Sequence, residues 1–378
     1  MPTAILAADD FRVDSLTQFA LGAAVGTALL GRQLGVRRAA LLGGLLGTLP
    51  DLDVYLPADD PVESFVGHRG WSHSLVVHAA AAPLIAEVLV RRLAALRETR
   101  IRVSCAVFLC LATHALLDAM NVYGTRLFWP LWPEPLGAGS IFIIDPLYII
   151  PLLVVTVWAF FLRDWKQTFG KTLAICLMIS TTYLGWTLIG QRIAEAKSAE
   201  YLAARGVVPD DLLAGPTPLN SFFWRVIAVD GSDYYHVYVP IAGDSSEVTA
   251  YRHARWQNDL SCWVGEAVAG SGIAGRLAKF AAGFYQVTSR GKDVIVSDLR
   301  MGLYPEYAFQ FAIGERKGEK ILDVPARRIH GKRSQPGDWE WLFAGVMGEG
   351  VIRPAEAARL LTELEMGPAA TGQSVKAC

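Results

Sequence analysis

The sequence predicts a mainly α-helical polytopic membrane protein of about six membrane helices, followed by an extracytoplasmic β-rich C-terminal domain. Of the 378 residues, 52% are hydrophobic and only 19% are charged, whereas soluble domains carry about 25% charged residues. The apolar stretches end near Gln191, and alternating patterns typical of strands follow. The net charge of −1 gives no indication of a nucleic-acid partner, which usually requires a basic patch.

Six apolar stretches precede Gln191. They cover approximately residues 16–31, 38–49, 74–92, 103–122, 144–162 and 171–190. The last four are long enough to cross a bilayer. The first two are shorter and rich in glycine, and small residues let helices approach closely in lipid. We therefore expect these two to pack as a helical hairpin, with ordinary buried helices of a bundle as the alternative.

Basic residues predict how these stretches are oriented. Eleven Lys and Arg residues lie in the connections after the first, third and fifth stretches, whereas the connections 50–73 and 123–143 hold only Arg69 and Arg126. The basic side of a membrane protein is normally cytoplasmic. We expect a multi-pass protein of the bacterial inner (plasma) membrane, with both termini, the two poorly basic connections and the C-terminal domain outside the cytoplasm.

Three domains follow from these patterns. Residues 1–192 form the membrane-embedded helical domain, 193–215 a helix and linker, and 216–378 a β-meander domain with a terminal helix at 353–365 and a tail. Hairpins are expected at 224–241, 284–299 and 307–322, each with glycine in its turn. The histidines of this last domain are expected to be ordinary surface residues; they are His236, His253 and His330.

Polar groups of the helical half are few, and they gather at the predicted outer ends of the stretches. They are Asp14, Gln18, Asp51, Asp53, His68, Arg69, His73, His114, Asp118 and Asp145. Ionisable groups near hydrocarbon are costly and usually face partners or a water-filled cavity. Their convergence at one predicted membrane face indicates a functional site.

Histidine and carboxylate ligands without thiolates suit zinc, manganese or iron in a hydrolytic site. His114 and Asp118 are four residues apart, so both project from one helix face and can bind one ion. A hydrogen-bonded helix pair is the alternative for these two, and a turn or helix cap for Asp51 and Asp53. Taken together, the motifs predict one or two divalent ions, with zinc foremost. The expected ligands are Asp51, His68, His73, His114 and Asp118, with Asp14 and Asp145 completing or supporting the set.

Asp53 is expected to act as the general base that orients a metal-activated water, although the roles of Asp51 and Asp53 could be exchanged. The guanidinium of Arg69 is suited to bind a phosphate group of a substrate. A structural ion pair with Asp51, Asp53 or Asp145 is an equal alternative. Two other functions stay open. One is a non-catalytic, metal-stabilised membrane protein whose β domain binds an envelope partner. The other is a transporter, which the apolar inner halves of the stretches disfavour.

The motifs DSLTQFALGAAVGTALLGR, GTLPDLDV, HRGWSHSL, THALLDAMNVYGT and SIFIIDPLY resemble the YdjM-type inner-membrane proteins, often described as LexA-regulated metal-dependent hydrolases. The resemblance covers about residues 14–165, with FFWRV and SDLRMG matching more loosely. It implies a hydrolase without naming a substrate.

A more distant similarity concerns zinc-dependent phospholipase C and the P1-type nucleases, in which an Asp, a His and an HxxxD motif follow in that order. It implies hydrolysis of a phosphoester, here in a membrane lipid or a lipid-linked envelope precursor. Those enzymes hold three metals with more histidines than this chain offers. The oligomeric state stays open.

Overall fold

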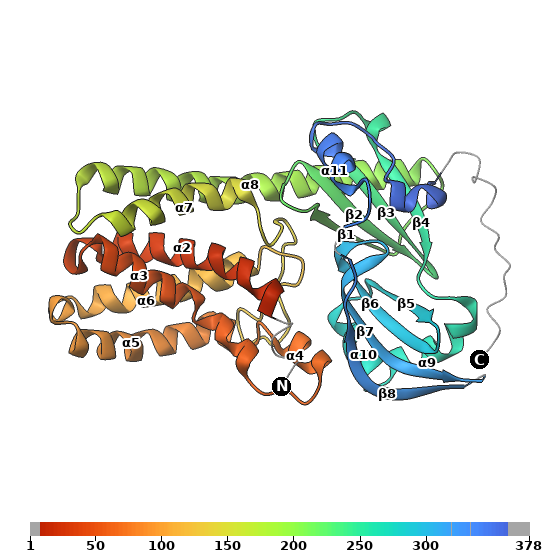
Figure 1. Cartoon of the computed structure of the whole chain (residues 1–378), viewed down its shortest axis with the longest axis horizontal. Coiled ribbons are helices and arrows are strands. Elements are labelled where there is room, and N and C mark those ends of the chain that lie inside the picture. The colour runs from red at the N-terminus through yellow and green to blue at the C-terminus, as the bar shows by residue number, and fades with distance from the viewer. Residues whose placement is uncertain (1–7, 319, 333, 362–378) are drawn as a thin grey trace. The chain divides into compact units, whose positions relative to one another are not determined.

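The computed structural model describes residues 8–318, 320–332 and 334–361, with the side chains of residues 8–14, 245 and 258 left out. The chain divides into two compact units (Figure 1). Unit 1 consists of the described residues up to Leu56, His68–Ile189 and Pro218–Ser221. Unit 2 consists of Pro57–Gly67, Gly190–Thr217 and the described residues from Phe222 onward.

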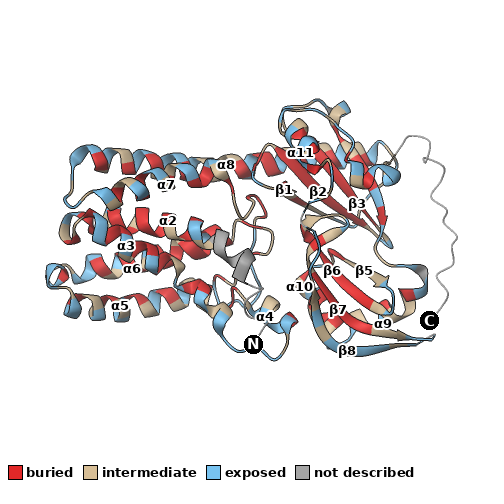
Figure 2. Cartoon of the chain, in the orientation of Figure 1, coloured by how far each residue is buried: buried red, intermediate tan, exposed pale blue. Residues whose placement is uncertain are grey.

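Unit 1 is a bundle of helices that bury apolar faces against one another (Figure 2). The helices are α2 (Ala8–Leu34), α3 (Val36–Thr48), α5 (Leu75–Arg92), α6 (Arg100–Asp118), α7 (Pro146–Phe161) and the first part of α8 (Gln167–Ala203), with 3-10 turns η1 (Pro50–Tyr55), η2 (Trp71–His73) and η3 (Ala94–Leu96). Ser74 caps α5 and Asp145 caps α7, each accepting two backbone N–H groups. These caps fix where both helices begin, next to the polar residues of the site.

The glycine-rich hairpin of α2 and α3 is confirmed. A Cβ atom at Gly43 would collide with the carbonyl oxygen of Gly22 and would lie 2.8 Å from the Cα of Gly26. A Cβ at Gly47 would lie 2.6 Å from the carbonyl oxygen of Gln18. Backbones this close leave no room for side chains, and the contact sets where the end of α3 lies.

The expectation of about six membrane helices is wrong. Among the described residues, α6 and α8 are long and apolar enough to cross a membrane, and a third span exists only if Pro61–His73 and α5 count as one broken helix. α3 has 13 residues and α7 has 16, fewer than the about 20 that hydrocarbon requires. α2 is long, but its glycines and its buried Thr17, Gln18 and Thr27 reduce its hydropathy.

Unit 2 contains two four-stranded antiparallel sheets, so the β-rich C-terminal domain is present. The first pairs β1 (Asp211–Pro216), β2 (Phe223–Asp230), β3 (Asp233–Pro240) and β4 (Thr249–Ala254) in that order, and the second pairs β5 (Tyr285–Arg290), β6 (Asp293–Leu303), β7 (Glu306–Lys317) and β8 (Lys320–Ile329). The three expected hairpins are confirmed as β2–β3, β5–β6 and β7–β8. Their turns hold Gly231, Gly291 and Gly318 at positive φ.

Short helices complete unit 2. They are α4 (Pro61–Gly67), α9 (Ser261–Ala269), α10 (Ile273–Phe280) and α11 (Asp338–Val346), with 3-10 turns η4 (Ser245–Glu247), η5 (Asn258–Leu260) and η6 (Pro354–Arg359). Phe65 of α4 stacks on Phe309 of β7, with ring centroids 4.2 Å apart. The closing helix expected at 353–365 is the 3-10 turn η6 as far as the described residues extend. α8 continues to Ala203 and β1 begins at Asp211, within the expected helix and linker.

The close contact of α2 and α3 predicts a sharp difference between two glycines. Gly43→Ala should lower the free energy of unfolding by about 1–3 kcal/mol, because the new methyl group collides with backbone that cannot turn aside. Gly185→Ala in α8 has open space at its Cβ position and should be neutral or stabilising by up to about 1 kcal/mol. Thermal unfolding of both variants in detergent measures this. Equal midpoints would contradict the packing argument.

Candidate metal centre

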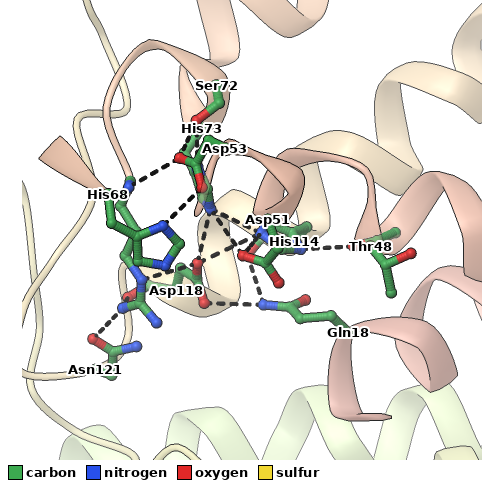
Figure 3. Close-up of polar contacts among 12 residues, drawn as sticks. Gln18, Thr48, Asp51, Asp53, His68, Ser72, His73, His114, Asp118 and Asn121 are labelled. Carbon is green, nitrogen blue, oxygen red and sulfur yellow. Dashed lines mark hydrogen bonds and ion pairs between the residues drawn. The ribbon is translucent and has the colours of Figure 1, made fainter. Parts of the chain in front are cut away.

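Four buried side chains of unit 1 come together at one point. Asp51, His73, His114 and Asp118 each offer a ligand atom, and these atoms lie within 4.8 Å of one another. All four residues are at most 3% exposed. Figure 3 shows them converging from η1, η2 and α6. The expected convergence of these four residues is therefore present in the structure.

Local structure explains how the sequence brings them together. His114 and Asp118 lie one turn apart near the C-terminal end of α6. Pro50 begins η1 and places Asp51 in its first turn. Arg69 has a φ of 63°, which reverses the chain just before η2 presents His73. Two tight turns thus bring their side chains onto the end of a regular helix.

The distances among the ligand atoms match the spacing around a single ion. His73 Nε2 lies 3.3 Å from both Asp51 Oδ1 and Asp118 Oδ2. His114 Nε2 lies 3.3 Å from Asp51 Oδ1, 3.5 Å from Asp118 Oδ2 and 3.0 Å from His73 Nε2. Ligands about 2.0–2.1 Å from a tetrahedral zinc are about 3.3 Å apart, and neighbouring positions of an octahedron are about 3.0 Å apart. Both coordination geometries fit.

Hydrogen bonds define which nitrogen of each imidazole carries hydrogen. His114 Nδ1 lies 2.6 Å from the carbonyl oxygen of Gly47, which can only accept, so Nδ1 donates. Ser72 Oγ gives its single proton to Asp53 Oδ2 at 2.6 Å and therefore accepts from His73 Nδ1 at 2.9 Å. In the neutral imidazoles both Nε2 atoms then carry lone pairs. Two lone pairs facing each other at 3.0 Å repel unless a cation lies between them. A proton on one Nε2 fills this place when no metal is bound, and a metal ion can replace it.

The carboxylates agree with this interpretation. Asp118 Oδ2 is buried and forms no hydrogen bond within the described part of the chain, although Arg69 and His73 form ion pairs with it. Such an acceptor suits a metal ligand. Burial alone would raise the pKa of Asp51, but the hydrogen bonds and charges of His114 and His73 reverse this and hold the pKa well below its ordinary value. Asp51 is therefore ionised and able to bind a cation.

A further layer of contacts holds Asp118 in place. Gln18 Nε2 donates to Asp118 Oδ1 at 3.0 Å. The Arg69 Nε atom lies 3.2 Å from Asp118 Oδ2, and Arg69 NH1 donates to Asn121 Oδ1 at 2.7 Å. Arg69 thus pairs with Asp118, a carboxylate that the sequence analysis did not consider for it. Gln18 holds a ligand candidate in place, a role that its sequence context signals only as an amide side chain within an apolar, glycine-rich helix.

The remaining expected residues lie around the four ligands. His68 Nδ1 is 2.8 Å from Asp53 Oδ1, and Asp53 also accepts from Ser72 and from the backbone N–H of Arg69. Burial would raise the pKa of Asp53, but the hydrogen bond and charge of His68 outweigh it and lower this pKa. The side chain of Asp14 lies outside the described residues.

Asp145 lies outside the four-ligand group. Its carboxylate caps α7 and accepts from Tyr183 at 2.7 Å. Burial raises its pKa despite these hydrogen bonds. A pocket joins the two sites, because Asp145 and Asp118 both line it, together with Asn121, Ile141 and Tyr148. Asp145 is thus placed beside the pocket and not on the ion.

A second histidine cluster in unit 2 corrects the expectation of surface histidines. His236, His253 and Glu356 are fully or almost fully buried and offer ligand atoms within 4.8 Å of one another. The strand pattern could have indicated this, because His236 alternates with Tyr234 and Tyr238 on one face of β3. His330 is exposed, as expected.

The distances in this second cluster are those of hydrogen bonds. Glu356 Oε1 lies 2.8 Å from His236 Nδ1 and 2.7 Å from His253 Nε2, closer than two ligands of one ion. Tyr238 and Arg353 each donate to Glu356 Oε2 at 2.8 Å. The guanidinium of Arg353 already neutralises the carboxylate and opposes a second cation. This cluster is a hydrogen-bonded network that fastens η6 to the first sheet.

The network predicts that unit 2 loses stability in acid. Burial lowers the pKa of His236 to about 3 even though Glu356 opposes the shift, and the two histidines hold the pKa of Glu356 well below its ordinary value. As the pH falls below 6.5, the unfolded chain gains a proton on His236 that the folded chain does not accept. Protonation of His236 in the unfolded chain should by itself lower the free energy of unfolding by about 2 kcal/mol between pH 7 and pH 5.

Urea unfolding of the full chain, followed by pulsed deuterium labelling of β3, measures this loss. His236→Gln should weaken the pH dependence, whereas His330→Gln, at an exposed position, should not change it. A stability of β3 that is constant from pH 7 to pH 5 would contradict the buried neutral histidine.

The four-ligand geometry predicts how metal content responds to substitution. Purified protein should carry about one divalent ion per chain, and His114→Ala should abolish it because three ligands hold a metal far more weakly than four. His68→Ala removes a histidine that contacts Asp53 and lies outside the four, so it should keep the ion. Elemental analysis of the two variants measures their metal content, and an unchanged metal content in His114→Ala would refute the assignment.

Comparison with known proteins agrees with the motif resemblance. Residues 13–194 match the family model described as YdjM inner membrane protein. No curated protein and no solved structure matches the chain. The matched segment contains all four ligand residues. Over residues 13–194, just under half of its length, the chain is therefore similar to the YdjM inner membrane proteins, the family that its motifs resemble.

Proposed function

We propose that the chain is a membrane-bound, metal-dependent hydrolase that cleaves a phosphoester in a lipid or an envelope precursor. The observation that supports this proposal most is the pair of Nε2 atoms 3.0 Å apart, flanked by Asp51 and Asp118. Zinc is the first candidate for the ion, with manganese or iron as alternatives. A bound ion of this kind lowers the pKa of a coordinated water and polarises a phosphoryl oxygen.

Residues around the ion have distinct proposed roles. The guanidinium of Arg69 would offset the charge that develops on the phosphate. Both oxygens of Asp53 are occupied by donors, so Asp53 would act through its neighbours and not as a free base. His68, whose side chain is 24% exposed, would exchange the proton with the reacting water. The Asp53 carboxylate would hold the His68 ring in the required tautomer.

The number of protein ligands supports a second candidate. Zinc sites with four protein ligands are usually structural, whereas catalytic zinc keeps an open position. A tetrahedral ion on all four residues would therefore favour a metal-stabilised, non-catalytic membrane protein whose β domain binds an envelope partner. An octahedral manganese or iron on the same residues would keep two positions open for water and substrate.

The proposed location is the bacterial inner membrane, with the metal centre and unit 2 outside the cytoplasm. The description of the matching family as inner membrane proteins supports the membrane location. The distribution of charge along α6 supports the orientation, because Arg100 and Arg102 lie at the beginning of this helix and the ligands His114 and Asp118 near its other end.

A turnover assay tests the hydrolase proposal directly. Purified protein would be incubated with a panel of lipid phosphodiesters and added zinc or manganese. Wild-type protein should release product, and His114→Ala should not. If His114→Ala unfolds the protein while Asp53→Asn leaves its cellular function intact, and no panel member is cleaved, the non-catalytic alternative is correct.

The contact between Ser72 and His73 gives a prediction that is independent of turnover. Ser72→Ala removes the acceptor that fixes the His73 tautomer, so metal affinity should fall about 10–100-fold. Ser72→Thr keeps the hydroxyl and should bind nearly as tightly as wild type. Competitive titration with a metal-binding dye measures both affinities. Equal affinity in Ser72→Ala and wild type would show that the hydrogen bond from His73 to Ser72 does not position His73 for metal binding.

A further inference from the structure

An exposed apolar rim borders the metal centre of unit 1. The rim consists of Tyr55, Leu56, Trp71, Leu131 and Trp132, of which Leu131 is 78% and Tyr55 74% exposed. Tyr55 and Leu56 lie at the end of η1, which carries Asp51. Trp71 begins η2, which carries His73. Two of the three rim segments are therefore continuous with segments that supply ligands.

The third rim segment is fastened to the same place by hydrogen bonds. The N–H of Arg126 donates to the carbonyl oxygen of Arg69 at 3.2 Å. The N–H of Leu75 donates to the Leu127 carbonyl oxygen at 2.8 Å, and Ser74 Oγ donates to that of Trp129 at 2.5 Å. The segment carrying Leu131 and Trp132 is thus held against the turn that carries His73.

The length of α6 indicates the depth of this rim in a bilayer. α6 has 19 residues, which at 1.5 Å per residue is about 28 Å, close to the thickness of the hydrocarbon. His114 and Asp118 lie near its C-terminal end, opposite its basic beginning. The ion and the rim therefore belong at the boundary between hydrocarbon and headgroups, where tryptophan and tyrosine are enriched.

We propose that this rim lies in the lipid headgroup boundary and admits a bilayer-resident amphiphile to the ion. The surface suits lipid because residues 127–136 contain one charged side chain, Glu134, and because contiguous exposed apolar surface is rare on faces that meet water. The phosphoester of such an amphiphile lies at headgroup depth, level with the ion. This inference rests on the proposed function for its substrate, but the position of the rim can be tested alone.

A spin label tests the position of the rim without any activity. Leu131→Cys in a Cys105→Ser background would be labelled and reconstituted into vesicles of phosphatidylethanolamine and phosphatidylglycerol. The label should collide more often with dissolved oxygen than with a water-soluble nickel chelate, as expected in lipid. A label at Asp211→Cys, an exposed position of unit 2, should show the reverse. A water-accessible label at Leu131 would overturn the proposal, and so would a label shielded from both reagents, as expected if a protein partner covers the rim.

A pair of substrates tests entry from the bilayer. The Leu131→Ser/Trp132→Ser variant should raise the KM for a vesicle-embedded phosphodiester about tenfold and leave hydrolysis of a water-soluble aryl phosphodiester within about twofold of wild type. Trp339→Ser, which removes an exposed tryptophan of unit 2, is the matched control and should change neither. Equal loss on both substrates, or no loss on either, would overturn the proposal. If wild type cleaves neither substrate, the hydrolase proposal fails while the spin-label result still decides the rim.

Discussion

The candidate metal centre of unit 1 depends on the close approach of the Nε2 atoms of two imidazoles. His73 and His114 place their Nε2 atoms 3.0 Å apart, and each ring is held in this orientation by a hydrogen bond on its far side. For His114 the acceptor is the carbonyl oxygen of Gly47, whose position follows from the glycine contacts of α2 and α3. The packing of small residues, the tautomers and the ligand geometry therefore form one chain of cause and effect.

The contacts around Asp118 connect this geometry to chemistry. Asp118 faces the ion position with one oxygen and Gln18 with the other, and Arg69 lies beside it. With an ion bound, this buried arginine would keep a second positive charge beside it without occupying a coordination position. The second cluster illustrates the contrast. There the carboxylate of Glu356 is saturated by four donors, and the histidines hold the sheet together without an ion.

Sequence reasoning predicted the convergence of Asp51, His73, His114 and Asp118, because rare polar residues stand out in apolar segments and the i, i+4 spacing of the last two fixes their common face. The three hairpins followed from glycine turns. The number of membrane spans was predicted wrongly, because α3 and α7 are apolar but shorter than hydrocarbon requires, and the buried polar residues and glycines of α2 reduce its hydropathy. The contact of His68 with Asp53 and that of His236 with Glu356 join segments far apart in the chain, which spacing does not encode.

The central claim is that one ion is held by two imidazoles and two carboxylates at the end of α6. X-ray absorption spectroscopy of the metal-loaded protein tests it most directly. The account predicts two histidine ligands, visible through the outer-shell scattering of their rings, with nitrogen and oxygen donors at about 2.0–2.2 Å. The coordination number then separates a closed four-ligand site from one with open positions. A spectrum without imidazole scattering, or a protein that binds no metal, would contradict the account.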